Sequence, residues 1–272
     1  MNIINLIQTK NKILSPIFPK TMARQAGNLF FTPMQGPIKD WEKEAENKGH
    51  RETYEDGLSA IRWGESDKRI LLVHGFSSRA TQMYGFVPFL LDAGFEVIAV
   101  DAPGHGQSPK SKANPLMVAN TLLKAQKHFG KFYGAIGHSV GGAAIAIAAN
   151  RGLDVEKSVL IAAPSSIQKV MDLFSSFMGL SPKSMQAFSE YVIKTVGEPP
   201  QALSPESIVM SMNSELFLIQ DEHDVEVPRG SIEKIAAAAK DPKVLRTKDL
   251  GHRKIIRDKA VHEQVGEFFK AG

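Results

Sequence analysis

Several features are absent from the sequence, and each absence narrows what the protein can be. The chain contains no cysteine, so disulfide bonds, thiolate nucleophiles and cysteine-based metal sites are excluded. It has no apolar run of about 18 residues, and its start lacks a basic leader followed by an apolar segment, so we expect a cytoplasmic protein without a membrane span. The 33 basic and 29 acidic residues are interspersed, so nucleic-acid binding is not implied.

The composition is that of an ordinary soluble globular protein, with 43% hydrophobic and 23% charged residues. A chain of 272 residues can form one domain or two, and the order of the motifs described below favours a single domain over residues 1–272. Residues 1–48 contain scattered apolar residues and several prolines, and we assign them no chemistry. Nothing in the sequence indicates an oligomeric state.

From residue 50 onward the sequence alternates between strand-like and helix-like segments. Asp56-Gly57 favours a tight turn between two short strands, Arg51–Tyr54 and Leu58–Trp63. The apolar runs typical of buried strands are Ile70–Val73, Glu96–Val100, Gly134–Ile136, Ser158–Ile161, Leu216–Ile219 and Val244–Thr247. The segments with helical spacing of apolar residues are Thr81–Leu91, Pro115–Phe129, Val140–Asn150, Ser231–Ala239 and Lys259–Phe269. This alternation predicts an α/β fold with a mostly parallel central sheet flanked by helices.

One interval breaks the alternation. About 50 residues without a strand signal separate two of the predicted strands, which is too long for an ordinary loop. Two helices are predicted within it, one from the apolar spacing of residues 167–178 and one after Ser181-Pro182. We therefore expect residues 165–213 to form a helical cap or lid. Its apolar side chains at Phe174, Phe177, Met178 and Phe188 are candidates for a substrate pocket.

The most specific chemical signal is Gly137-His138-Ser139-Val140-Gly141-Gly142, between a predicted strand and a predicted helix. A serine on a sharp strand-to-helix turn needs glycine two residues before and after it, because a Cβ at either position would collide with a neighbouring element. An isolated match could be a chance glycine-rich turn, but its position argues against this. Ser139 is therefore a candidate nucleophile.

Two other segments follow predicted strands. In His74-Gly75-Phe76, glycine lets the backbone approach a substrate, and the amides of Phe76 and Val140 are candidates to face a developing oxyanion. His74 is interpreted as a hydrogen-bonding residue of the framework and not as a second base. In the loop that begins at Asp101, we interpret the aspartate as fixing the loop and His105 as facing solvent.

An acid and a histidine follow the serine in chain order. Asp221 and Asp224 come after one predicted strand, and His252 comes after the next. The order serine, acid, histidine is one of the known orders of a catalytic triad. The residues alone leave both aspartates open as the acid.

Taken together, these motifs resemble those of the α/β-hydrolase superfamily over about residues 50–270, apart from the insertion. The resemblance implies that Ser139 is the nucleophile, His252 the base and Asp224 the acid, with Phe76 and Val140 as the oxyanion amides. The family usually has glycine three residues before the acid, where this chain has Asp221, so Asp221 stays open as an alternative acid.

The resemblance implies a carboxylesterase-like serine hydrolase that acts on a small-molecule ester or related acyl compound and needs no metal or organic cofactor. A serine nucleophile argues against the related dehalogenases and epoxide hydrolases, which use aspartate. A cofactor-free perhydrolase or a carbon–carbon hydrolase would keep the same triad, so the sequence leaves both open. A ligand-binding relative without catalysis is a further alternative from a different class.

Overall fold

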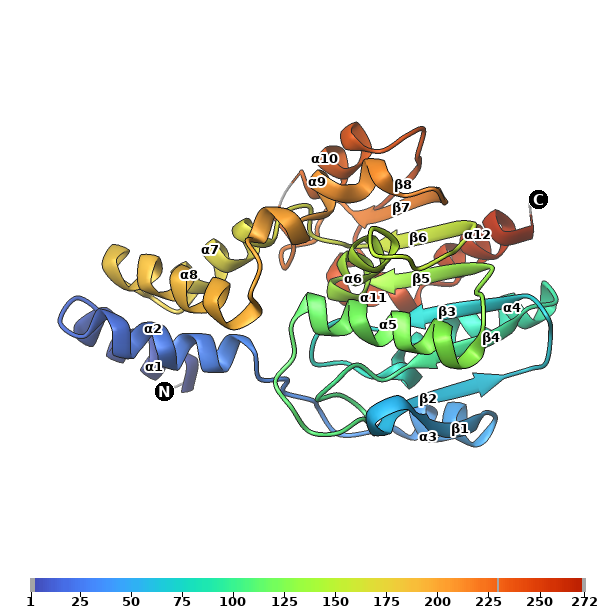
Figure 1. Cartoon of the computed structure of the whole chain (residues 1–272), viewed down its shortest axis with the longest axis horizontal. Coiled ribbons are helices and arrows are strands. Elements are labelled where there is room, and N and C mark those ends of the chain that lie inside the picture. Colours follow the sequence, from blue (N-terminus) through green and yellow to red (C-terminus); the bar gives the residue numbers. More distant parts are fainter. Residues whose placement is uncertain (1–2, 229, 271–272) are drawn as a thin grey trace.

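The computed structural model describes residues 3–228 and 230–270, which form a mostly parallel sheet flanked by helices (Figure 1). The strands are β1 (His50–Tyr54), β2 (Leu58–Trp63), β3 (Arg69–Val73), β4 (Glu96–Val100), β5 (Gly134–His138), β6 (Lys157–Ile161), β7 (Glu215–Asp221) and β8 (Lys243–Thr247). They form one eight-stranded sheet in the order β1-β2-β4-β3-β5-β6-β7-β8. The pairs β1–β2 and β2–β4 are antiparallel and the other pairs are parallel, which confirms the predicted fold class.

The α-helices of the described residues are α1 (Ile3–Leu14), α2 (Pro19–Phe30), α3 (Asp40–Asn47), α4 (Val87–Asp92), α5 (Pro115–Phe129), α6 (Val140–Ala149), α7 (Ile167–Phe177), α8 (Pro182–Val196), α9 (Pro205–Ile208), α10 (Ser231–Ala238), α11 (Gly251–Lys254) and α12 (Lys259–Lys270). The 3₁₀ segments are η1 (Glu55–Gly57), η2 (Ala80–Phe86), η3 (Pro200–Leu203), η4 (Val209–Ser211) and η5 (Ile255–Arg257). The helix expected over Thr81–Leu91 is divided into η2 and α4. Pro88 lies in the first turn of α4, where its missing N–H is tolerated, whereas within one continuous helix it would remove a hydrogen bond.

The sheet buries both of its faces. In β3, Leu71 and Val73 belong to the apolar core that includes α5 and α6, while Ile70 and Leu72 belong to the core that includes α4 and α12. Successive side chains of a strand point to opposite faces, so a continuous apolar run places large residues in both cores. This explains why β3 contains no polar residue between Ile70 and Val73.

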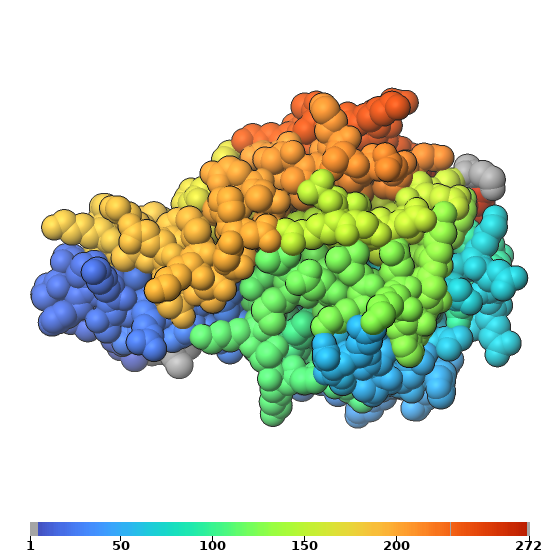
Figure 2. Space-filling view, viewed as in Figure 1, coloured from blue at the N-terminus to red at the C-terminus, as the bar shows by residue number. Residues whose placement is uncertain are grey.

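A helical lobe, formed by α1, α2, α7 and α8, lies beside the sheet (Figure 1). The N-terminal hairpin, α1 and α2 with the turn between them, packs against α7 and α8, which lie within the predicted insertion (Figure 2). Asn11 donates a 2.8 Å hydrogen bond to the carbonyl of Met178, and the Ser184 hydroxyl donates one of 2.8 Å to the carbonyl of Ser15. The N-terminal residues, which had no assigned role, thus pack closely on the insertion.

Candidate active site

Ser139 occupies the turn from β5 into α6 in a strained conformation, with φ 53° and ψ −118°. The neighbouring glycines are required by the packing of this turn. A Cβ on Gly137 would lie 2.5 Å from the backbone of Gly141, and a Cβ on Gly141 would lie 2.4 Å from the carbonyl oxygen of Val73. Only glycine therefore lets β5, the turn and β3 approach so closely. Strained backbone of this kind is found most often at functional sites.

His252 lies in α11, which follows β8, and Asp224 lies on the loop that follows β7; the two side chains are hydrogen-bonded to each other. His252 Nδ1 donates to Asp224 Oδ2 at 2.8 Å, while Asp224 Oδ1 accepts from the amides of Glu226 at 2.8 Å and Val227 at 3.1 Å. The Asp224 side chain is buried. Burial opposes its charged form, but the bond to His252 and the two amides outweigh burial, so the pKa of Asp224 lies below its usual value.

Asp221, the other candidate acid, uses its carboxylate to join the end of β7 to the end of β8 and the residues before α11. Its Oδ2 accepts from the Thr247 hydroxyl at 2.8 Å and from the Leu250 amide at 3.1 Å, and its Oδ1 accepts from the His223 amide at 2.9 Å. Burial raises the pKa of Asp221, but the hydrogen bonds to its carboxylate lower it by more. The pKa of Asp221 therefore lies below the usual value. Asp221 thus ties β8 and the start of α11 to β7, and within the described residues the carboxylate that bonds to the His252 ring is that of Asp224.

His138 connects the His252 segment to the turn that carries Ser139. Its Nε2 donates to the carbonyl oxygen of His252 at 2.8 Å, and the centres of the two rings lie 4.8 Å apart. Burial, followed by the nearby His252, lowers the pKa of His138 to about 3, so its ring is neutral at neutral pH. The residue before the serine thereby places His252 at the same edge of the sheet as Ser139.

The His74-Gly75-Phe76 segment runs past the serine. A Cβ on Gly75 would lie 3.3 Å from Ser139 Cβ, which shows how closely the two backbones approach. Within residues 3–228 and 230–270, the amide of Phe76 has no hydrogen-bond acceptor. The amide of Val140 is the first of α6, where intrahelical acceptors are absent. Both amides are therefore available to a ligand atom.

His74 and His105 are framework residues in this structure. His74 Nδ1 donates to the Gly75 carbonyl at 2.7 Å, and its Nε2 accepts from the Ala102 amide at 3.1 Å. His105 uses its ring in the same way, between the Pro103 carbonyl and the Ser77 amide. The expectation that His105 faces solvent is wrong, because it is only 1% exposed and packs against the ring of His74.

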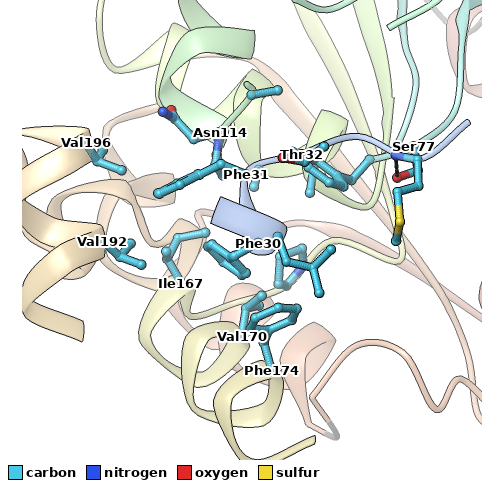
Figure 3. Close-up of a pocket in the computed structure, with 18 of the residues that line it drawn as sticks. Phe30, Phe31, Thr32, Ser77, Asn114, Ile167, Val170, Phe174, Val192 and Val196 are labelled. Carbon is cyan, nitrogen blue, oxygen red and sulfur yellow. Dashed lines mark hydrogen bonds between the residues drawn. The ribbon is translucent and has the colours of Figure 1, made fainter. Parts of the chain in front are cut away.

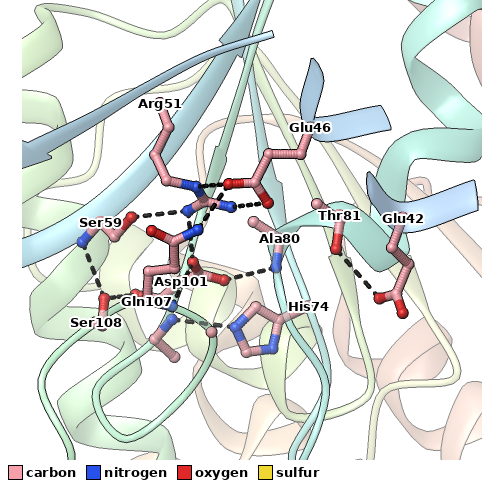
Figure 4. A network of polar contacts seen from close by, with 12 residues as sticks. Glu42, Glu46, Arg51, Ser59, His74, Ala80, Thr81, Asp101, Gln107 and Ser108 are labelled. Atoms are coloured by element: carbon pink, nitrogen blue, oxygen red, sulfur yellow. Dashed lines mark hydrogen bonds and ion pairs between the residues drawn. The ribbon is translucent and has the colours of Figure 1, made fainter. Parts of the chain in front are cut away.

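Asp101 fixes its loop through a network that joins three segments of the chain (Figure 4). Its carboxylate accepts from Arg51 of β1 at 2.8 Å, from the amide of Ala80 at 2.8 Å and from the amide of Gln107 at 3.0 Å. A Cβ on Gly106 would lie 2.0 Å from this carboxylate. The network holds the strand ends near the Phe76 segment, and its partners are those of a structural framework.

An apolar cavity of about 510 Å³ begins beside the serine turn and extends into the helical lobe (Figure 3). Phe76, Ser77 and Val140 line it near the sheet, and Phe174, Phe177 and Met178 line it in the lobe. Phe188 is not among the lining residues. It is 1% exposed, and its ring packs behind those of Phe30 and Phe174 at centre-to-centre distances of 5.5 and 5.7 Å. Three of the four expected pocket residues therefore line the cavity, and Phe188 supports its wall.

The N-terminal segment supplies cavity residues for which sequence reasoning had no role. They are Ile7, Leu29, Phe30, Phe31, Thr32 and Met34. A signal was present, because Met22, Ala26, Leu29 and Phe30 follow the spacing of one helical face. The pattern indicates an amphipathic helix, but it does not indicate which distant segment covers its apolar face.

Within the described residues, no group of three or more side chains suited to hold a metal ion is gathered. The same residues contain no helix that is both long enough and apolar enough to cross a bilayer.

A serine at a strand-to-helix turn, with an Asp–His pair in the segments that follow later strands of a mostly parallel sheet, is the arrangement of the α/β-hydrolase class. The family model for the alpha/beta hydrolase fold matches residues 68–218, more than half of the chain, and the chain belongs to this family. The resemblance noted from the motifs is thereby confirmed. None of the curated proteins searched matches the chain.

Solved structures share the fold at low sequence identity. An esterase from Pyrococcus furiosus is 21% identical, with a TM-score of 0.65 over 88% of this chain and 98% of its own. A putative lipase from Acinetobacter baumannii is 13% identical, with a TM-score of 0.64 over 87% of this chain and 98% of its own. A membrane phospholipase A, described as a bacterial virulence factor, is 18% identical, with a TM-score of 0.62 over 95% of this chain and 92% of its own.

Proposed function

We propose that the protein is a serine hydrolase that cleaves a carboxylic ester or related acyl compound through an acyl-enzyme intermediate. The observation that carries the proposal is the Asp224–His252 hydrogen bond, on a segment held by His138 beside the strained turn of Ser139. An acid, a base and a serine on such a turn match the requirements of nucleophilic acyl transfer. The esterase and lipase names of the structural neighbours agree with this proposal.

The proposed mechanism begins with His252. Its Nδ1 proton is donated to Asp224, so Nε2 is the unprotonated nitrogen and can take the proton of Ser139. The serine oxygen attacks the acyl carbon, and the negative charge that develops on the carbonyl oxygen is stabilised by the amides of Phe76 and Val140. His252 then gives its proton to the leaving alcohol. Water, activated by the same base, releases the acid.

Within this proposal, residues 1–272 act as one α/β-hydrolase domain and residues 165–213 act as a cap over Ser139. The cavity supports the role of the cap, because its lining passes from Val140 at the serine turn to Phe174 and Met178 in the insertion. An acyl group attached to Ser139 would enter this cavity. The mechanism uses no metal or organic cofactor.

Covalent labelling with a fluorophosphonate tests the nucleophile. The intact protein should be labelled at Ser139 and should hydrolyse p-nitrophenyl esters, whereas Ser139→Ala should lose both properties. Its thermal midpoint should not fall, because the geometry of the turn is set by its glycines. Ser78→Ala is the matched control, since this nearby buried hydroxyl has no hydrogen-bond partner among the described residues. Normal labelling of Ser139→Ala would refute the proposal.

A further inference from the structure

The N-terminal hairpin is built into the wall of the cavity. Phe30, the last residue of α2, lines the cavity and packs against the insertion. Its ring centre lies 4.9 Å from that of Phe174 and 5.4 Å from that of Phe31. The close approach of α2 and α8 depends on Gly27, where a Cβ would lie 2.3 Å from the Tyr191 ring. The hairpin and the insertion therefore form two facing walls of one chamber (Figure 3).

The side chains that line the chamber are almost all apolar. None of those among the described residues is charged, and each of the three polar ones makes at least one hydrogen bond within the protein. Thr32 donates to the Asn28 carbonyl at 2.7 Å, Ser77 Oγ accepts from the Met34 amide at 2.9 Å, and Asn114 Oδ1 accepts from the Met117 amide at 3.0 Å. A ligand that matches this lining is a hydrocarbon.

The size of the chamber also favours a long group over a short one. At about 510 Å³ it lies in the range of small-molecule sites, about 300–1,000 Å³, and an acetyl group would leave most of it empty. Atoms that line an unfilled apolar space lose van der Waals contacts. Each additional methylene that enters the chamber should therefore strengthen binding.

We infer that residues 7–34 form half of an acyl-binding chamber and that the natural substrates are esters of medium- or long-chain acyl groups. This inference rests on the proposed function. The acyl carbon is held at Ser139, and the chain extends past Phe76 and Val140 between α2 and α7, toward Ile7 of α1. The N-terminal hairpin thus determines the acyl-chain length that the site accepts.

The first test is the acyl-chain profile of the intact protein. Burial of a methylene contributes about 0.8 kcal/mol, so kcat/KM for p-nitrophenyl esters should rise about fourfold per methylene from acetyl until the chamber is filled. Ile7→Trp should shorten the preferred chain, so that kcat/KM for the longest esters falls relative to that for the acetyl ester. Leu6→Trp is the matched control, because this neighbouring side chain is 51% exposed and does not line the chamber.

A binding measurement keeps the test independent of catalysis. In the Ser139→Ala background, calorimetry with octanoate, decanoate and dodecanoate should show tighter binding with each step in length and a negative heat-capacity change. Ile7→Trp should weaken dodecanoate binding at least tenfold, and Leu6→Trp should change it less than twofold. Thermal midpoints verify that each variant is folded.

The possible failures are distinguishable. If the intact protein is labelled at Ser139 but its activity is flat or falls beyond the acetyl ester, the acyl-chamber inference is overturned and the serine hydrolase remains. An identical effect of Ile7→Trp and Leu6→Trp would also overturn it. If the intact protein is not labelled at Ser139, the proposed function itself fails.

Discussion

Substitution by asparagine should affect the two neighbouring aspartates differently: at Asp224 it should lower turnover, and at Asp221 it should lower thermal stability. In Asp224→Asn, the side-chain oxygen can still accept from the amides of Glu226 and Val227, so the new NH₂ group faces His252 Nδ1. An NH₂ group donates hydrogen bonds and cannot accept one from Nδ1, so the imidazole adopts the tautomer with its proton on Nε2. That nitrogen then cannot take the proton of Ser139, and kcat should fall about 10⁴-fold with little change in stability.

In Asp221→Asn, the oxygen can remain on the His223 amide, which turns the NH₂ group toward Thr247 and Leu250. The threonine hydroxyl can rotate and accept, but the Leu250 amide is a donor and loses its partner. An unsatisfied group of this kind costs about 1–3 kcal/mol, which corresponds to a drop of about 2–5 °C in the thermal midpoint of a chain of this length. Activity per folded molecule should fall less than tenfold.

Steady-state kinetics on one ester and thermal unfolding of both variants measure these effects. Asp249→Asn is the matched control, because Asp249 is 76% exposed and its ion pair is with the exposed His223, so both readouts should stay near those of the original protein. A loss of turnover in Asp221→Asn as large as that in Asp224→Asn, at equal folded fraction, would refute the assignment of the acid.

Two further predictions concern the histidines. His252→Ala should lower turnover by several orders of magnitude, whereas His105→Ala should mainly lower the thermal midpoint; an equal loss of turnover per folded molecule would contradict the choice of base. Burial lowers the pKa of His74 to about 3, below its unfolded value of about 6.5, so the unfolded state binds the extra proton. The stability that depends on neutral His74 is complete above about pH 6.5 and declines as the pH falls toward 3. Between about pH 6.5 and pH 3, the free energy of unfolding measured with urea should rise with pH less steeply in His74→Gln than in the original protein, by about 1.4 kcal/mol per pH unit. An unchanged slope would contradict this role of His74.

The interior of the sheet was predictable because its strands are short and apolar on both faces, as in β3 and β4. The run Ile70–Val73 can satisfy its backbone and bury every side chain only as an interior strand, and β3 begins one residue before it. The serine turn was predictable for a similar local reason, since Gly137 and Gly141 meet steric limits within a few residues of Ser139. In both places, neighbouring positions in the sequence determine the structure.

Features that depend on distant segments were not predictable. The burial of His105 depends on a hydrogen bond from Ser77 in another loop, and a polar residue in a Gly/Pro-rich turn carries no sign of such a partner. Likewise, the periodicity that identified Phe188 as apolar could not show that the rings of Phe30 and Phe174 would separate it from the cavity. For the same reason the sequence could not distinguish the surroundings of Asp221 from those of Asp224, because their hydrogen-bond partners are spread over residues 223 to 252.

The helical lobe also has a consequence for the order in which the chain folds. In the sequence, the strands β1 to β6 lie between its two halves, the N-terminal hairpin and the pair α7 and α8. During synthesis α2 therefore emerges long before α8, which ends at Val196. Because synthesis proceeds at about 5–20 residues per second, about 10–30 s pass between the synthesis of the N-terminal hairpin and that of α8, whose side chains cover Phe30. Until then its apolar face has no partner within the nascent chain, and chaperones have access to it. The lobe must therefore close late in folding, after the sheet strands that precede α7 have been made.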